Sequence, residues 1–201
     1  MGSIPFGYLA GRVKGVDLRE HGSRNIGATN AMRVLGKAWG IPVFLLDFVK
    51  GYLPALLWWR YGAADAGEWL RYGGLVLVSL ATILGHTYTC FLQFKGGKGV
   101  ATTAGVLMSI SPMVAVTAFS CWAVALVLTR YVSVASIVAA LTMVVAALYD
   151  YGYFTVSGWF LRADVLVIVF LVLVAVLVIY KHKGNIERVL AGTEPKAFSK
   201  K

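Results

Sequence analysis

The sequence predicts an all-α, polytopic membrane helical bundle, and its composition and the arrangement of its apolar residues support that prediction. Of 201 residues, 59% are hydrophobic and only 14% are charged, and the mean hydropathy is +0.74. A soluble domain carries about a quarter charged residues. The apolar residues form long uncharged stretches, as expected where helices cross a lipid bilayer. No polar stretch is long enough for a second domain, so we expect a single transmembrane domain over residues 1–201.

Six apolar segments follow the first loop and predict helices. They are 38–59, 70–94, 100–110, 113–129, 131–148 and 165–180. A seventh segment, 4–13, is too short to cross an apolar core about 30 Å thick at about 1.5 Å per residue. It is not a signal peptide either, because no basic region or cleavage site accompanies it.

The loop charges predict how the chain is oriented in the membrane. The chain has 19 Lys and Arg against 9 Asp and Glu, a net charge of +10. If the uncharged run 99–129 breaks at Pro112 into two crossings, fifteen basic residues fall on one side and three on the other, with Lys50 inside a span. As one crossing, the split is nine and nine. Basic loops stay cytoplasmic and proline ends or kinks helices, so we predict two segments. The first is short and is shielded by neighbouring helices.

This topology places the polar segments together on the cytoplasmic face. They are residues 14–37, residues 95–99, the turn at Arg130 and the tail after Lys181. These segments are also the most chemically distinctive parts of the chain. The sequence therefore predicts a functional site at the cytoplasmic surface of the membrane.

The first motif is KGVDLREHGSRNIGATNAMRVLG, residues 14–36. Its small hydroxyl and amide side chains are Ser23, Asn25, Thr29 and Asn30. Such groups among glycines are suited to cradling phosphate oxygens. Arg24 and Arg33 would add charge-assisted hydrogen bonds. The alternative interpretation is an ordinary polar loop at the membrane interface.

The second motif is FKGGKGVATT, residues 94–103. Lys98 is followed by glycine rather than Ser or Thr, so the motif departs from the Walker A pattern and an ATPase or GTPase is disfavoured. Its glycines are Gly96, Gly97 and Gly99. Their backbone N–H groups can converge on an anion, Lys98 adds a compact positive charge, and the helix expected to begin nearby points its N-terminus at the same anion. The alternative is a glycine-rich turn with lysines that orient the protein.

Two further motifs carry candidate site residues. In RYVSVAS, Arg130 opens a span, and Ser133 and Ser136 share a helical face, where they bind substrate or provide small residues at a helix contact. In KHKGNIERVLAGTE, His182 and Asn185 are likewise spaced i, i+3. His182 could bond or protonate a phosphoryl oxygen, although a lone interfacial histidine is usually not catalytic.

Charged residues also occur within and beside the spans. Asp47 and Lys50 are spaced i, i+3 within the second span, where one charge costs roughly 2.5–3.5 kcal/mol, so we expect them to pair in a structural or pocket-lining role. His86 is expected to be a hydrogen-bonded interior residue. Glu194 is expected to pair with Arg or Lys. The two cysteines lie in apolar segments and indicate neither a disulfide framework nor a metal site.

The combination of GSIPFGYL, GSRNIGATNAMRVLG, GHTYTCFLQFKGGKGVAT, RYVSVAS and KHKGNIERVLAGTE resembles the bacterial acyl-phosphate:glycerol-3-phosphate acyltransferases. The resemblance spans nearly the whole chain. It implies a seven-helix enzyme of the bacterial inner membrane that transfers a fatty acyl group from acyl phosphate to the 1-hydroxyl of sn-glycerol 3-phosphate. The products are lysophosphatidic acid and phosphate. The implied partners are these two substrates and membrane lipid, with no cofactor, metal or nucleic acid, and the oligomeric state stays open.

The motifs and the resemblance together indicate the site residues of this chain. Catalytic roles are expected for Ser23, Arg33, Lys98, His182 and Asn185. Substrate-binding roles are expected for Asn25, Thr29, Asn30, Gly96, Gly97, Gly99, Arg130, Ser133 and Ser136. Structural roles are expected for Glu194, Asp47 and Lys50.

Three departures from the family pattern stand out. Arg24 occupies a position where a small, flexible residue is usual, and Thr89 stands where the family usually has proline. Relatives carry further apolar residues ahead of GSIPFGYL, so we expect a truncated first helix and a misassigned start at Met1.

The reaction implied by the resemblance needs positioning and charge neutralisation more than a covalent intermediate, because acyl phosphate is already activated. The proton of the attacking hydroxyl would pass to His182 or to a substrate phosphate oxygen. The competing functions are a transporter for a small organophosphate anion, with the Asp47–Lys50 pair in its favour, and a non-catalytic scaffold.

Overall fold

A computed structural model describes residues 1–62, 67–153 and 165–197 of the chain. Across these ranges all regular structure is helical, which confirms the predicted fold class. The chain divides into two compact units, Met1–Ser109 and Ile110–Lys201. The expectation of a single domain stays a prediction.

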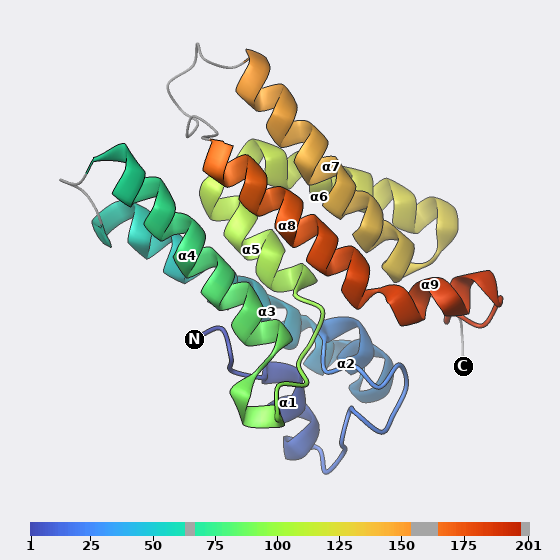
Figure 1. The fold of residues 1–201 in the computed structure, drawn as a ribbon. Helices are drawn as coiled ribbons and strands as arrows, with labels where there is room; N and C mark the ends of the chain where they lie inside the picture. Colours follow the sequence, from blue (N-terminus) through green and yellow to red (C-terminus); the bar gives the residue numbers. More distant parts are fainter. Residues whose placement is uncertain (63–66, 154–164, 198–201) are drawn as a thin grey trace. The chain divides into compact units, whose positions relative to one another are not determined.

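The first unit is built around the long helix α3. Its helices are α1 (Phe6–Val13), α2 (Ala28–Leu35), α3 (Lys37–Leu57), α4 (Glu68–Thr87) and α5 (Val100–Ile110). A π-helical turn, η1 (Trp58–Gly62), continues α3, and a 3₁₀ turn, η2 (Cys90–Leu92), follows α4. Helices α1, α2 and α4 all pack against α3 (Figure 1).

The second unit is a set of helices packed in sequence order. They are α6 (Pro112–Thr129), α7 (Val132–Tyr153), α8 (Val165–Lys181) and α9 (Lys183–Leu190). Helix α7 packs against α6 and α8 (Figure 1). The chain bends by 51° between α8 and α9, with His182 at the bend.

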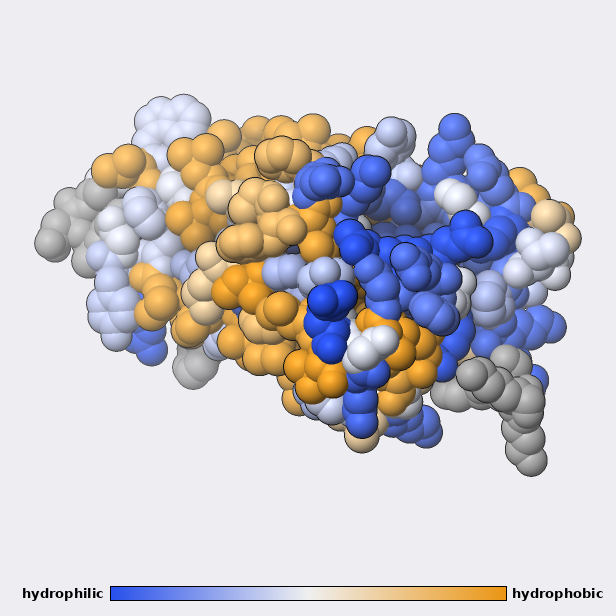
Figure 2. Space-filling view, turned by 90° about the horizontal axis from the view of Figure 1, so that it is seen from below, coloured by the Kyte–Doolittle hydropathy of each residue, from blue (hydrophilic) through white to orange (hydrophobic). Residues whose placement is uncertain are grey.

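Four helical stretches in the described ranges are long and apolar enough to cross a membrane. They are Lys37–Gly62, Trp69–Leu92, Pro112–Thr129 and Val132–Tyr149, and the bent pair α8–α9 would make a fifth. Large apolar side chains on these helices face outward, among them Leu45, Leu77, Phe119 and Val127. Figure 2 shows broad hydrophobic areas on the surface, beside an area where hydrophilic side chains gather. An outward apolar surface of this extent suits lipid rather than water.

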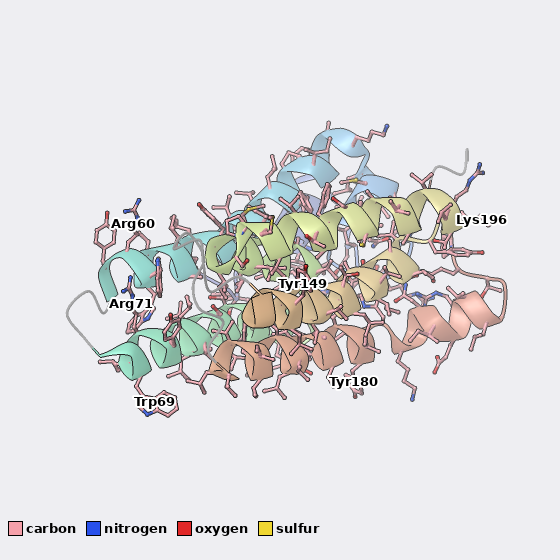
Figure 3. All side chains as sticks on the ribbon, turned by 90° about the horizontal axis from the view of Figure 1, so that it is seen from above. Arg60, Trp69, Arg71, Tyr149, Tyr180 and Lys196 are labelled. Carbon is pink, nitrogen blue, oxygen red and sulfur yellow. The ribbon has the colours of Figure 1, made fainter. Side chains whose placement is uncertain are left out.

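Aromatic and arginine side chains gather where η1 meets α4. The guanidinium of Arg71 lies 3.7 Å from the ring centre of Trp59, and the indole N–H of Trp58 donates to the Arg71 carbonyl at 3.0 Å. Figure 3 shows Arg60, Trp69 and Arg71 at this end of the two helices. Tryptophan with arginine is typical of the membrane–water interface, where an apolar ring and a polar head are both accommodated.

All six predicted apolar segments coincide with helices, and the break at Pro112 is confirmed. Ser111 has extended backbone (φ −145°), its side chain accepts a hydrogen bond from the Val114 amide, and Pro112 opens α6. Proline is favoured there because the first helical N–H has no intrahelical partner. The expectation for 70–94 was wrong at its end, since α4 stops at Thr87 and the chain then turns through η2.

Helix α2 was not predicted, because it lies within a motif that resembles a polar loop. Its apolar side packs into a small core of Ala10, Leu18, Ala31 and Val43, with Ala28, Val34, Leu35 and Trp39 around it. About a third of the first motif, the eight residues of α2, is therefore helix, and its buried side packs against α3.

Candidate functional site

Asn30 organises the first motif. Its side-chain oxygen accepts a hydrogen bond from the Ser23 amide at 2.8 Å, and its amide nitrogen donates to the carbonyls of Leu18 at 3.1 Å and His21 at 3.0 Å. Asn30 is buried at the first turn of α2. These bonds fix the loop that carries Ser23, and so point to loop organisation rather than substrate contact for Asn30.

Two other features shape this loop. Arg24 has a left-handed backbone (φ 57°), and the side-chain oxygen of Asn25 accepts from the Gly27 amide at 2.8 Å. The left-handed region favours glycine, which gives a physical reason why a small, flexible residue is usual at Arg24. Earlier in the loop, hydrogen bonds from the Arg19 side chain lower the pKa of Asp17 to about 2.

The glycine-rich loop lies on the C-terminal end of α4. The amide of Gly97 donates to the His86 carbonyl and the amide of Gly96 donates to the Thr87 carbonyl, both at 3.1 Å. These two N–H groups are therefore already used within the protein. An anion at this loop would be met by Lys98 and by the N-terminus of α5, whose first N–H groups lack intrahelical partners.

The three glycines are required for different reasons. A β-carbon at Gly96 would overlap the His86 carbonyl oxygen, and one at Gly97 would overlap the His86 imidazole. Gly99 instead has φ +80°, a conformation that other residues rarely adopt. Two of the glycines thus permit close approach, and only the third permits the turn into α5.

The first turn of α5 carries two hydroxyl groups that were not predicted as part of the site. Thr102 and Thr103 are buried, and neither hydroxyl has a hydrogen-bond partner. A β-carbon at Gly99 would lie 3.9 Å from the Thr103 hydroxyl oxygen. The pair of threonines directly after the glycine-rich loop was the only signal for them in the sequence.

The N-terminal segment contacts the first motif and the turn that follows α4. The hydroxyl of Thr89 donates to the Ser3 carbonyl at 2.6 Å, which ties the start of η2 to this segment. At Gly7 in α1, a β-carbon would overlap the Ile26 carbonyl of the first motif. Thr89, where the family usually has proline, therefore makes a contact that proline could not make.

The buried pair Asp47–Lys50 is present, as its spacing predicts. Lys50 Nζ lies 2.7 Å from Asp47 Oδ1. His86 Nδ1 lies 3.5 Å from the same oxygen. His86 is buried as expected, but its Nδ1 has no hydrogen-bond partner.

In the second unit, the carboxylate of Glu194 accepts hydrogen bonds from three side chains. Its Oε1 accepts hydrogen bonds from Ser133 at 2.8 Å and Asn185 at 2.6 Å, and its Oε2 accepts from Arg188 at 2.8 Å. The expected pairing of Glu194 with a basic residue is thus confirmed, the partner being Arg188. Burial raises the pKa of Glu194, but the hydrogen bonds from Asn185, Ser133 and Arg188 outweigh it and lower the pKa below its usual value.

The other predicted residues of this unit are His182, Ser136 and Arg130. His182 is the N-cap residue of α9. Its Nδ1 lies 2.7 Å from the Val178 carbonyl oxygen. Because a carbonyl oxygen can only accept, Nδ1 carries the proton in the neutral ring and Nε2 carries the lone pair. Ser136 donates to the Val132 carbonyl at 2.8 Å. Arg130 ends α6 with φ 60°, and its carbonyl accepts from the Ala197 amide at 2.7 Å.

Apolar helices, a buried ion pair and a glycine-rich loop seated on a helix end define a multi-pass membrane protein with polar sites. The family model described as glycerol-3-phosphate acyltransferase matches residues 1–192. The chain belongs to the glycerol-3-phosphate acyltransferase family.

Individual relatives agree with this assignment. The glycerol-3-phosphate acyltransferase of Aquifex aeolicus is 42% identical over 194 residues, covering 96% of this chain and 92% of the relative. That of Fusobacterium nucleatum is 40% identical over 197 residues, covering 98% and 92%. The chain is thus an acyltransferase by family.

Two crystal structures share the fold. Both are of PlsY, described as an integral membrane glycerol 3-phosphate acyltransferase. The glycerol 3-phosphate form matches with a TM-score of 0.83 at 42% identity, and the lysophosphatidic acid form with 0.80 at 41%. Each match covers 97% of this chain and 89% of the other. The integral membrane fold is therefore shared as well.

Proposed function

We propose that the protein transfers a fatty acyl group from acyl phosphate to the 1-hydroxyl of sn-glycerol 3-phosphate, releasing lysophosphatidic acid and phosphate. The observation that carries the proposal is the glycine-rich loop, which places Lys98 immediately before the N-terminus of α5. The two PlsY structures, which are the glycerol 3-phosphate form and the lysophosphatidic acid form, support the acceptor and the product.

The proposed phosphate contacts in the first unit are Lys98, Arg33 and the first amides of α5. Both a fixed positive charge and a helix N-terminus favour a bound anion. Thr103, buried and without a hydrogen-bond partner beside Gly99, adds a hydroxyl to the same turn. Gly96 and Gly97 contribute by letting the loop approach α4, since their own amides donate to α4 carbonyls.

Ser23 and Asn25 are proposed to orient the substrate, on a loop that Asn30 fixes. We keep the catalytic role that the resemblance assigns to His182, whose hydrogen bond to Val178 orients its ring. The contacts to Glu194 favour positioning roles for Ser133 and Asn185. No covalent acyl intermediate is required, because phosphate is a good leaving group and the attacking hydroxyl mainly needs orientation.

The proposed location is the bacterial inner membrane, with the motif loops and the C-terminus in the cytoplasm. The split of basic residues, fifteen against three, supports this orientation, since basic loops remain cytoplasmic. The interfacial cluster of Arg60, Trp69 and Arg71 would then lie at the opposite surface.

The test is phosphate release from acyl phosphate by the purified protein in detergent, with and without glycerol 3-phosphate. We expect release that depends on glycerol 3-phosphate, formation of 1-acyl lysophosphatidic acid, and no product when acyl-CoA replaces acyl phosphate. A transporter or scaffold would release no phosphate, and transfer from acyl-CoA alone would overturn the proposed donor.

A further inference from the structure

Three ionisable side chains lie buried together in the first unit. Asp47 and Lys50 are each 2% exposed and His86 is 5% exposed. A buried ion pair often contributes little stability over an apolar replacement of the same volume, so its presence needs another explanation. Here the pair connects separate segments of the chain.

Lys50 reaches the N-terminal segment as well as Asp47. Its ammonium donates a hydrogen bond to the Ile4 carbonyl at 2.8 Å and lies 5.4 Å from the ring centre of Phe6. Asp47 faces α4, because the oxygen that contacts Lys50 also lies 3.5 Å from His86 Nδ1. The charges therefore link α1, α3 and α4 at a single point.

His86 carries that link to the glycine-rich loop. Its carbonyl accepts the hydrogen bond from the Gly97 amide. Its imidazole occupies the place that a β-carbon on Gly97 would take, and all three atoms nearest to that place belong to the ring. At Gly96, by contrast, the nearest atoms are backbone atoms of His86 and Thr87.

We propose that His86, held by the Asp47–Lys50 pair, is a positioning residue. It sets the distance between the glycine-rich loop and the C-terminal end of α4, and hence the position of Lys98. This inference rests on the proposed function, in which Lys98 binds a substrate phosphate. One side of the imidazole lies against Gly97, and on the other side its Nδ1 lies 3.5 Å from Asp47 Oδ1. A shift of about 1 Å in such a support can cost on the order of 100-fold in rate, since transfer depends on placement.

The two glycines provide a matched pair of tests. Gly97→Ala should raise the KM for glycerol 3-phosphate at least about tenfold, with a smaller change in kcat, because the new methyl group lifts the loop off the imidazole. His86→Ala removes the ring, so the double variant His86→Ala/Gly97→Ala should recover much of that loss. The methyl group of Gly96→Ala would collide with backbone atoms of His86 and Thr87. Adding His86→Ala to that variant should therefore give no recovery.

Recovery at Gly97 without recovery at Gly96 supports the proposal. Equal responses at both glycines, or a double variant no better than Gly97→Ala alone, overturn it. Thermal unfolding in detergent establishes that the compared variants are folded. If His86→Ala does not fold, Asp47→Asn/Lys50→Met is the second variant, because it removes both charges together. It should raise the KM for glycerol 3-phosphate, and an unchanged KM overturns the proposal.

A different result would show that the proposed role of Lys98 is wrong while the role of His86 holds. If Lys98→Ala leaves the kinetics of glycerol 3-phosphate unchanged while His86→Ala still rescues Gly97→Ala, the support of the loop stands and the ligand assigned to Lys98 is wrong.

Discussion

The hydroxyl of Ser133 donates a 2.8 Å hydrogen bond to the carboxylate of Glu194, which lies 61 positions later in the chain. The same carboxylate oxygen accepts from Asn185 at 2.6 Å. The beginning of α7, the helix α9 and the segment after α9 are thus joined by one buried side chain.

Glu194→Ala should lower the free energy of unfolding by at least ~2 kcal/mol, because the donors of Ser133 and Asn185 lose their acceptor in a buried place. Glu194→Gln, which keeps one acceptor oxygen, should cost less. The measurement is thermal unfolding in detergent, with the exposed Glu187→Ala as the control. A Tm for Glu194→Ala equal to that of the control would contradict the structural role.

The stability should also depend on pH through Glu194. Its folded pKa is lowered below the unfolded value near 4.5, so the carboxylate stabilises the fold at higher pH and that contribution is lost as pH falls through the folded pKa. The Tm should therefore fall as the pH is lowered below about 4.5. Glu194→Gln should lack this part of the decline, and an identical profile in both proteins would refute it.

Asn30→Ala should reduce kcat/KM at least about tenfold, because the Ser23 loop loses three hydrogen bonds that fix it. Glu20→Ala is the control, since Glu20 is an exposed residue of the same loop. The comparison is steady-state kinetics of both variants beside their Tm values. Similar kinetics for the two variants would show that Asn30 does not hold the loop in its active form.

Lys98→Ala should raise the KM for glycerol 3-phosphate about tenfold or more, as expected for the loss of a charge-assisted hydrogen bond worth roughly 1.5–3 kcal/mol. Lys95→Ala, in the same loop and exposed, should change it far less. Equal effects of the two substitutions would indicate a general effect of positive charge instead of a contact by Lys98.

Arg24→Gly should stabilise the protein by up to ~1 kcal/mol, because glycine adopts the left-handed backbone at that position without strain. Arg24→Ala, which keeps a β-carbon, serves as the control and should not gain stability. The order of the three Tm values checks the prediction, and a lower value for glycine than for alanine would contradict it.

The longer helices were predictable from the sequence, because long apolar runs and one proline determine where they lie. The segment ending at Ile110 and the helix opening at Pro112 followed from proline chemistry and from the distribution of loop charge. Helix α2 was not predicted, because it has only eight residues inside a polar motif and its apolar side becomes evident only where it packs against α3.

For the candidate site, the sequence indicates residue types but not the contacts that each residue makes. Composition cannot distinguish an amide that meets a substrate from one that, like Asn30, bonds to the carbonyls of a turn. Nor can it show that Gly97 is small because the His86 ring lies against it. Such roles depend on which backbone atoms come close in space, and a single sequence does not record those distances.

The hydrogen bonds near the end of the chain make this tail a vulnerable part of the protein. A polypeptide that stops before Glu194 would leave the donors of Ser133 and Asn185 without their acceptor, and one that stops before Ala197 would lose the hydrogen bond to the Arg130 carbonyl. Premature termination or clipping by a carboxypeptidase in these few residues should therefore lower the stability of the protein, whereas a chain ending at Ala197 keeps both attachments.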